Sequence, residues 1–150
     1  MDQFTGTREK TTQHAFDLAR LETWLALHLP EFEGPLTVEQ FKGGQSNPTY
    51  KLVTPSRAYV MRTKPGPVAK LLPSAHAIER EFRVMNALAL TPVPVACMHV
   101  LCEDEAVLGR AFYIMEFVPG RVFWEQALPS LDKPRRAEIY DEMNRVIAAL

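Results

Sequence analysis

A glycine pair followed by short polar residues is the first stretch of the chain that could do chemistry. It reads Gly43, Gly44, Gln45, Ser46, Asn47. Glycine reaches unusual backbone angles and has no side chain, so the N–H groups of such a turn can approach an anion closely. A phosphate-binding turn is one interpretation. A solvent-exposed β-turn is the other, and this stretch alone favours it because glycine-rich turns are common.

Two cations stand near the end of a strand that follows this turn. Arg62 and Lys64 are separated by one residue, and Val60 precedes Arg62 at the same spacing. Side chains alternate between the two faces of a strand, so these three residues should share one face. That face would offer an apolar surface to a ligand ring and a positive charge to its phosphates.

A carboxylate is predicted on the inner side of the next helix, which we expect over about residues 75–90. Glu81 falls among the apolar residues of this helix, whereas Glu79 is expected to point away from them. A buried carboxylate is costly unless it meets a cation. We therefore expect Glu81 to pair with Arg62 or Lys64. The alternative is a residue at the rim that reaches water, and periodicity alone leaves both open.

The elements around these residues predict an α+β fold. The pattern favours a helix over about residues 12–29, three strands within 36–64, the helix of Glu81, strands over about 95–102 and 111–118, and a last helix from about 133. The nearly apolar strand 111–118 should be central in the sheet. The acidic run Glu103–Glu105 is interpreted as a solvated hairpin tip rather than a metal site.

The composition limits the function classes. The chain has 150 residues, 47% of them hydrophobic and 23% charged, which suits one globular domain. A net charge of −1 argues against a nucleic-acid or membrane-surface binder. Cys97 and Cys102 lack metal-site spacing with His. Without a signal peptide or a membrane-length apolar run, the expected setting is the reducing cytoplasm.

Taken together, these motifs resemble the N-terminal lobe of the protein-kinase-like fold in its aminoglycoside-phosphotransferase branch. Residues 41–47 resemble the phosphate loop, 59–62 the strand that binds the nucleotide phosphates, 80–85 the helix whose Glu pairs with that strand, and 115–118 the hinge that binds adenine. The chain is most similar, over about residues 13–150, to phosphotransferase domains fused to or encoded beside acyl-CoA dehydrogenases.

The resemblance implies a five-stranded antiparallel sheet with one packed helix, plus an N-terminal helix and a C-terminal helix. Residues 1–12 would be a flexible N-terminus, and 13–118 the kinase-like lobe. Residues 119–150 would be a linker and the first helix of an incomplete second lobe. Protein kinases have Lys where this chain has Arg62. Arg binds phosphate through two parallel hydrogen bonds, so the electrostatic role is kept, with Lys64 as the second candidate.

The resemblance also implies ATP as cofactor and transfer of its γ-phosphate to a substrate hydroxyl, for which a hydroxyacyl-CoA is one acceptor. The turn 43–47 would cover the phosphates, and Arg62, oriented by Glu81, would hold them. The adenine would lie against the residues Val60, Met115, Glu116, Phe117 and Val118.

The family's catalytic His-x-Asp segment and its Mg²⁺-binding Asp are not recognised in the sequence, because none of the four histidines is followed two residues later by Asp. Phosphoryl transfer needs a positioned base and metal ions. We therefore expect the Mg²⁺ ligands in a missing C-terminal lobe and the 150 residues alone to be inactive. The alternative is a non-catalytic nucleotide- or protein-binding module. Dimerisation is left open.

Overall fold

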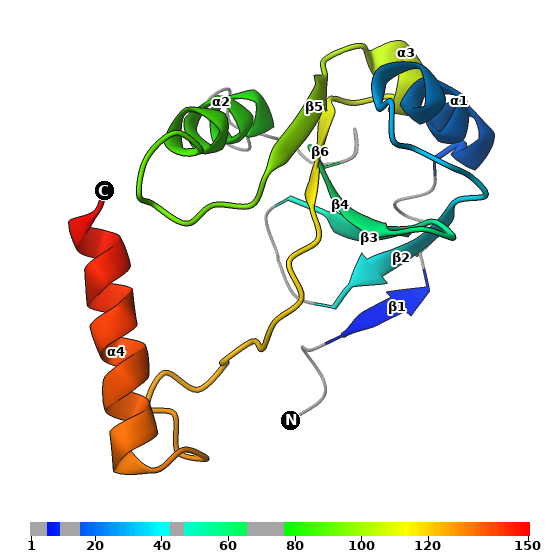
Figure 1. Cartoon of the computed structure of the whole chain (residues 1–150). Helices are drawn as coiled ribbons and strands as arrows, with labels where there is room; N and C mark the ends of the chain where they lie inside the picture. Colours follow the sequence, from blue (N-terminus) through cyan, green and yellow to red (C-terminus); the bar gives the residue numbers. More distant parts are fainter. Residues whose placement is uncertain (1–5, 10–15, 43–46, 66–76) are drawn as a thin grey trace.

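The computed structural model describes residues 6–9, 16–42, 47–65 and 77–150. Its helices are α1 (Leu18–His28), α2 (Ile78–Leu88), α3 (Glu105–Leu108) and α4 (Lys133–Ala148). Its strands are β1 (Thr7–Glu9), β2 (Thr37–Phe41), β3 (Thr49–Val53), β4 (Ala58–Thr63), β5 (Met98–Cys102) and β6 (Phe112–Glu116). Figure 1 shows one twisted sheet with α1 and α2 beside it and α4 set apart from it.

All neighbouring strands of the sheet are antiparallel, in the order β1-β2-β3-β4-β6-β5. The five predicted strands are present as β2 to β6, and β4 lies between β3 and β6. The sixth strand, β1, is a correction. Residues 7–9, expected within a flexible N-terminus, pair with β2, where Thr7 lies opposite Phe41.

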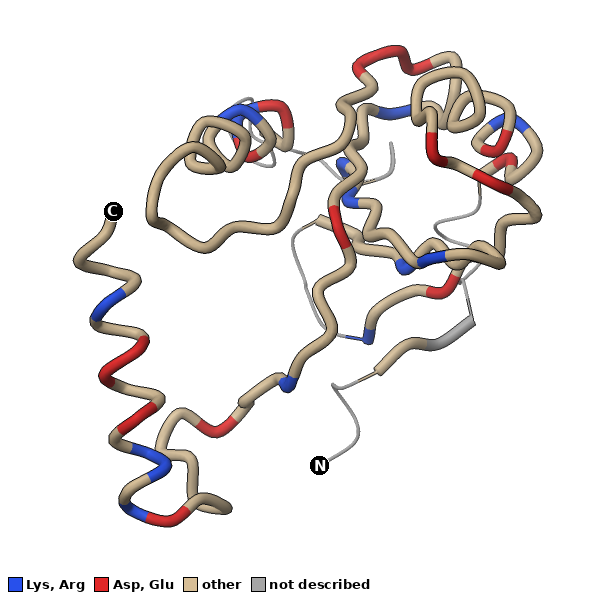
Figure 2. Tube along the Cα trace, in the orientation of Figure 1, with Lys and Arg blue, Asp and Glu red and all other residues tan. Residues whose placement is uncertain are grey.

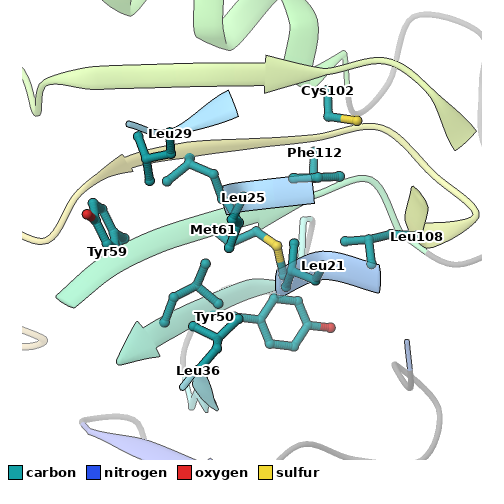
Figure 3. Close-up of a cluster of buried hydrophobic side chains, with 12 residues drawn as sticks. Leu21, Leu25, Leu29, Leu36, Tyr50, Tyr59, Met61, Cys102, Leu108 and Phe112 are labelled. Carbon is teal, nitrogen blue, oxygen red and sulfur yellow. The ribbon is translucent and has the colours of Figure 1, made fainter. Parts of the chain in front are cut away.

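The two faces of the sheet are buried by different helices. Leu21 and Leu25 of α1 are completely buried against the face that carries Tyr50, Met61 and Phe112 (Figure 3). The opposite face receives α2 through a smaller cluster made of Ile78, Met98, Ala111 and Tyr113. Since alternate residues of each strand face opposite sides, this arrangement decides which side chains of β4 and β6 can meet α2.

The acidic run after β5 differs in part from its prediction. Glu103 and Glu105 are exposed, as expected for a solvated tip, but Asp104 caps a one-turn helix, α3. Its carboxylate accepts a hydrogen bond from the N–H of Ala106 at 2.9 Å, and Gly109 ends the turn with φ 72°. A side-chain cap and a left-handed glycine are the usual signals that bound a helix, but one turn is too short to show periodicity.

The last helix, α4, begins as predicted near residue 133, and Asp132 caps it by accepting from the N–H of Arg135 at 2.9 Å. None of its residues is buried. Figure 2 shows acidic and basic positions mixed along α2 and along α4, so neither helix presents charge of a single sign. No helix in the described ranges has both the length and the apolar character that a bilayer crossing demands.

Candidate functional site

A row of three polar side chains crosses the centre of the sheet on the face toward α2. Arg62 of β4 lies opposite Thr49 of β3 and opposite Tyr113 of β6. Nη1 of Arg62 donates to Oγ1 of Thr49 at 3.2 Å. The strand register therefore sets the guanidinium between two hydroxyl groups.

Glu81 projects from α2 onto this row. Nε of Arg62 donates to Oε2 of Glu81 at 2.8 Å, and the two side chains are 28% and 35% exposed. The predicted contact between the helix carboxylate and the strand guanidinium is therefore confirmed, and the Glu81 side chain keeps partial access to water. Its role toward a nucleotide stays a prediction.

Asn47 joins the same cluster from the end of the glycine turn. Its side chain donates from Nδ2 to Oε1 of Glu81 at 3.1 Å, and the residue is only 2% exposed. The residues Gly43, Gly44, Gln45 and Ser46, predicted to cover phosphates, lie outside the described residues. The structure thus brings the last residue of the predicted turn to the carboxylate of α2.

Lys64, the second candidate cation, has a partner of its own. It forms an ion pair with Glu79 in the first turn of α2. The prediction that Glu79 points away was therefore wrong, because the end of β4 lies beside the start of α2. Burial acts to raise the pKa of Glu79, but hydrogen bonds from Lys64 and from its own backbone, with the nearby positive charges, lower the pKa overall. Arg62 and Lys64 share a face, as predicted.

Tyr113 is a residue that sequence reasoning did not assign to the site. Its hydroxyl donates to Oε2 of Glu81 at 3.3 Å. Burial, together with the neighbouring carboxylate, raises the pKa of Tyr113 to about 12, so the hydroxyl keeps its proton at neutral pH. Its place one strand from Arg62 follows from the β4–β6 register, which a single sequence does not reveal.

The predicted adenine-binding segment begins at the end of β6. The N–H of Glu116 donates to the carbonyl of Cys97 at 2.8 Å, and its side-chain Oε2 accepts from the N–H of Cys97 at 3.1 Å. Val118 is 60% exposed, and within the described residues its N–H has no hydrogen-bond partner. Met115 lies opposite the buried Val60 in the register of β4 and β6.

Lys51 is another residue that the sequence analysis did not single out. It lies opposite Val60 in the β3–β4 register, and its Nζ stands 4.7 Å from the centre of the Phe117 ring. A cation over an aromatic face is attracted by the ring quadrupole. The segment after β6 is therefore attached to the sheet through a side chain as well as through the backbone of Glu116.

An open hollow of about 530 Å³ lies where α2 meets β4 and β6. It is lined by Arg62, Arg80, Glu81, Val84, Met85, Tyr113 and Met115. The Arg62–Glu81 pair thus stands at the wall of a hollow whose other surfaces are largely apolar. Within the described residues, no group of three or more His, Cys, Asp or Glu side chains is arranged to hold a metal ion.

The chain is similar in sequence to parts of longer proteins. The chain is 43% identical to mouse (Mus musculus) acyl-CoA dehydrogenase family member 11. This match covers 99% of the chain but only 19% of that protein. The chain is also 49% identical to mouse acyl-CoA dehydrogenase family member 10 over 78% of this chain and 11% of that protein. The chain therefore matches only a small part of these curated relatives.

A solved crystal structure resembles the fold itself. It is that of a Ralstonia eutropha protein provisionally assigned as an aminoglycoside phosphotransferase, with 63% identity and a TM-score of 0.76. The match covers 90% of this chain and 38% of that one. Residues 37–150 match the model of the phosphotransferase enzyme family. On this evidence, the chain belongs to the phosphotransferase enzyme family.

Proposed function

We propose that the chain is the ATP-binding lobe of a small-molecule kinase, which transfers the γ-phosphate of ATP to a substrate hydroxyl. The observation that carries this proposal is the Arg62–Glu81 pair, which lies next to Asn47 at the end of the glycine turn. In a kinase lobe, such a pair holds a cation where the phosphates lie.

The polar groups left over at the site suit a nucleotide. Among the described residues, Nε and Nη1 of Arg62 have partners and Nη2 has none, so one edge of the guanidinium is available to a phosphate oxygen. Val60 offers an apolar surface on the same strand face. The carbonyl of Glu116 and the N–H of Val118 would bind the edge of the adenine ring.

The chain's own residues would bind and orient ATP, and other groups would complete the reaction. Glu81 fixes the guanidinium of Arg62, which would bind the phosphates without losing its proton. ATP would supply the phosphoryl group, and Mg²⁺ would neutralise the phosphate charge. The described residues do not form a metal site, so we assign no Mg²⁺ ligand to them and place both the metal ligands and the base in a second lobe.

The domain division follows from this assignment. Residues 13–118 would form the nucleotide-binding lobe, and 119–150 the linker and first helix of the second lobe. For the acceptor we propose a hydroxyacyl-CoA, because the relatives named above are acyl-CoA dehydrogenase family members. An aminoglycoside is the second candidate, suggested by the assignment of the Ralstonia protein.

The proposal is tested by titrating the chain with ATP and Mg²⁺ and measuring binding by calorimetry and by the shift in melting temperature. Arg62→Ala should weaken ATP binding about tenfold, because a charged hydrogen bond contributes about 1.5–3 kcal/mol. The matched control is Arg57→Ala, which breaks an exposed ion pair with Glu31 away from the site. Absence of ATP binding by the unmodified chain would refute the proposal and favour a non-catalytic protein-binding module.

A further inference from the structure

Four residues from three segments of the chain close a ring of hydrogen bonds. Asn47 donates to Oε1 of Glu81 at 3.1 Å, and Nε of Arg62 donates to Oε2 of the same carboxylate at 2.8 Å. Nη1 of Arg62 donates to Oγ1 of Thr49 at 3.2 Å, and that hydroxyl donates to the backbone carbonyl of Asn47 at 3.2 Å. Every member therefore has a partner of the correct polarity.

The ring leaves little choice for the side chain at position 47. Glu81 offers only acceptors when it is ionised, so its partner at Oε1 must be a donor. The amide of Asn47 meets this need without adding a charge, and it is nearly inaccessible to solvent. A carboxylate at this position would stand beside the carboxylate of Glu81, and two adjacent negative charges in a poorly solvated place repel strongly.

The same residue is the first described one after the glycine turn. Its side chain is bonded to α2, while its backbone carbonyl is bonded to Thr49 on β3. A displacement of α2 that moves Glu81 would therefore disturb the contacts of both Asn47 and Arg62.

We propose that Asn47 is a positioning residue for the nucleotide phosphates, which acts through Glu81 on the guanidinium of Arg62. This inference rests on the proposed function, because it takes the phosphates of ATP as the ligand of Arg62. Asn47 then holds Oε1 of Glu81, while Oε2 accepts from Arg62 and from Tyr113.

The test compares ATP with adenosine, which has the same ring but no phosphates. Asn47→Ala should weaken ATP binding about tenfold, as expected for a lost hydrogen bond to a charged group, and leave the Kd for adenosine within about twofold. Asn47→Asp should weaken ATP binding further. The matched control is Asn86→Ala, an exposed asparagine of α2, which should change neither Kd.

A double-mutant cycle then asks whether Asn47 acts through Glu81. In a Glu81→Ala background, Asn47→Ala should change the Kd for ATP by less than about twofold. An undiminished loss in that background would overturn the inference, as would equal losses for ATP and adenosine, which indicate a general structural defect. If Asn47→Ala does not fold, Asn47→Ser, which keeps a small polar group in the turn, is measured with the same expectations.

The two proposals fail in different ways. If the unmodified chain binds ATP and Asn47→Ala binds it equally well, the inference about Asn47 is wrong and the proposed function stands. If the unmodified chain does not bind ATP, the proposed function is wrong and this inference falls with it.

Discussion

Oε2 of Glu81 on α2 lies 2.8 Å from Nε of Arg62 on β4. The helix packs on the sheet through an apolar cluster around Ile78, so the packing of α2 decides where the guanidinium points. Changes to the ion pair, to its neighbours, to the packing and to the end of β6 should therefore have separable effects on ATP binding and on folding.

Replacing Glu81 by Ala should weaken ATP binding about tenfold without unfolding the chain. Arg62 would keep its charge but lose the partner that orients it, and the pair is about one-third exposed, so water can solvate the freed guanidinium. ATP titration and thermal melting measure the two effects. Glu142→Ala on α4, which breaks an exposed pair with Arg145, is the control, and an unchanged ATP affinity for Glu81→Ala would remove the role assigned to Glu81.

Replacing Lys64 by Ala should lower stability in a pH-dependent way. The pKa of Glu79 lies below its ordinary value of 4.5 in the folded chain. A lowered folded pKa contributes stability above the unfolded pKa, and this contribution disappears as the pH falls through the folded pKa. The cost of Lys64→Ala should therefore be below about 1 kcal/mol near neutral pH and should shrink below pH 4.5.

Urea denaturation near neutral pH and in acid measures this difference, with the exposed Lys133→Ala as control. The affinity of Lys64→Ala for ATP should stay within about twofold of the unmodified chain, because Arg62 is the residue assigned to the phosphates. A tenfold loss of ATP affinity would instead identify Lys64 as the phosphate ligand.

Replacing Ile78 by Ala should destabilise the chain by about 2–4 kcal/mol, because deleting a buried aliphatic side chain leaves a cavity. Ile78 is completely buried between α2 and the sheet, whereas Leu90, just after α2, is 95% exposed. Leu90→Ala is therefore the matched control and should cost less than about 0.5 kcal/mol. Urea denaturation measures both values, and equal costs would contradict the packing of α2 described here.

Replacing Val118 by Pro should weaken the binding of ATP and adenosine by the same factor, about five- to tenfold, because proline has no N–H to offer the adenine. Val122→Pro, at an exposed valine in the same connecting segment, should leave both affinities within twofold. Calorimetry with each ligand gives the ratio. A loss confined to ATP would show that this segment serves the phosphates rather than the ring.

Much of this arrangement was accessible from the sequence because it depends on local patterns. The alternation of apolar residues in β3 and β4 predicted which side chains share a face. The helical spacing placed Glu81 among apolar residues but left open whether it meets a cation or reaches water. Both conclusions need only the fixed periods of strands and helices. The apolar run of β6 likewise indicated a central strand, and β6 lies between β4 and β5.

What the sequence did not reveal depends on contacts between distant segments. β1 is a short polar strand that exists through its pairing with β2, and its own residues carry no strand pattern. The contacts of Glu81 with Asn47 and Tyr113 join residues 34 and 32 positions away in the chain. Such contacts require the strand register and the placement of α2, neither of which periodicity can supply.

Two hydrogen bonds join Glu116, through its backbone N–H and its side chain, to the backbone of Cys97, and they have a mechanical consequence. They anchor the last residue of β6 to the chain that enters β5, and Lys51 steadies the ring of Phe117 that follows. A rotation of α4 relative to the sheet would therefore use changes in the backbone angles after Phe117, in the exposed stretch that starts at Val118. The proposed adenine-binding surface begins at the anchored residues Glu116 and Phe117, so it would keep its shape while α4 rotates.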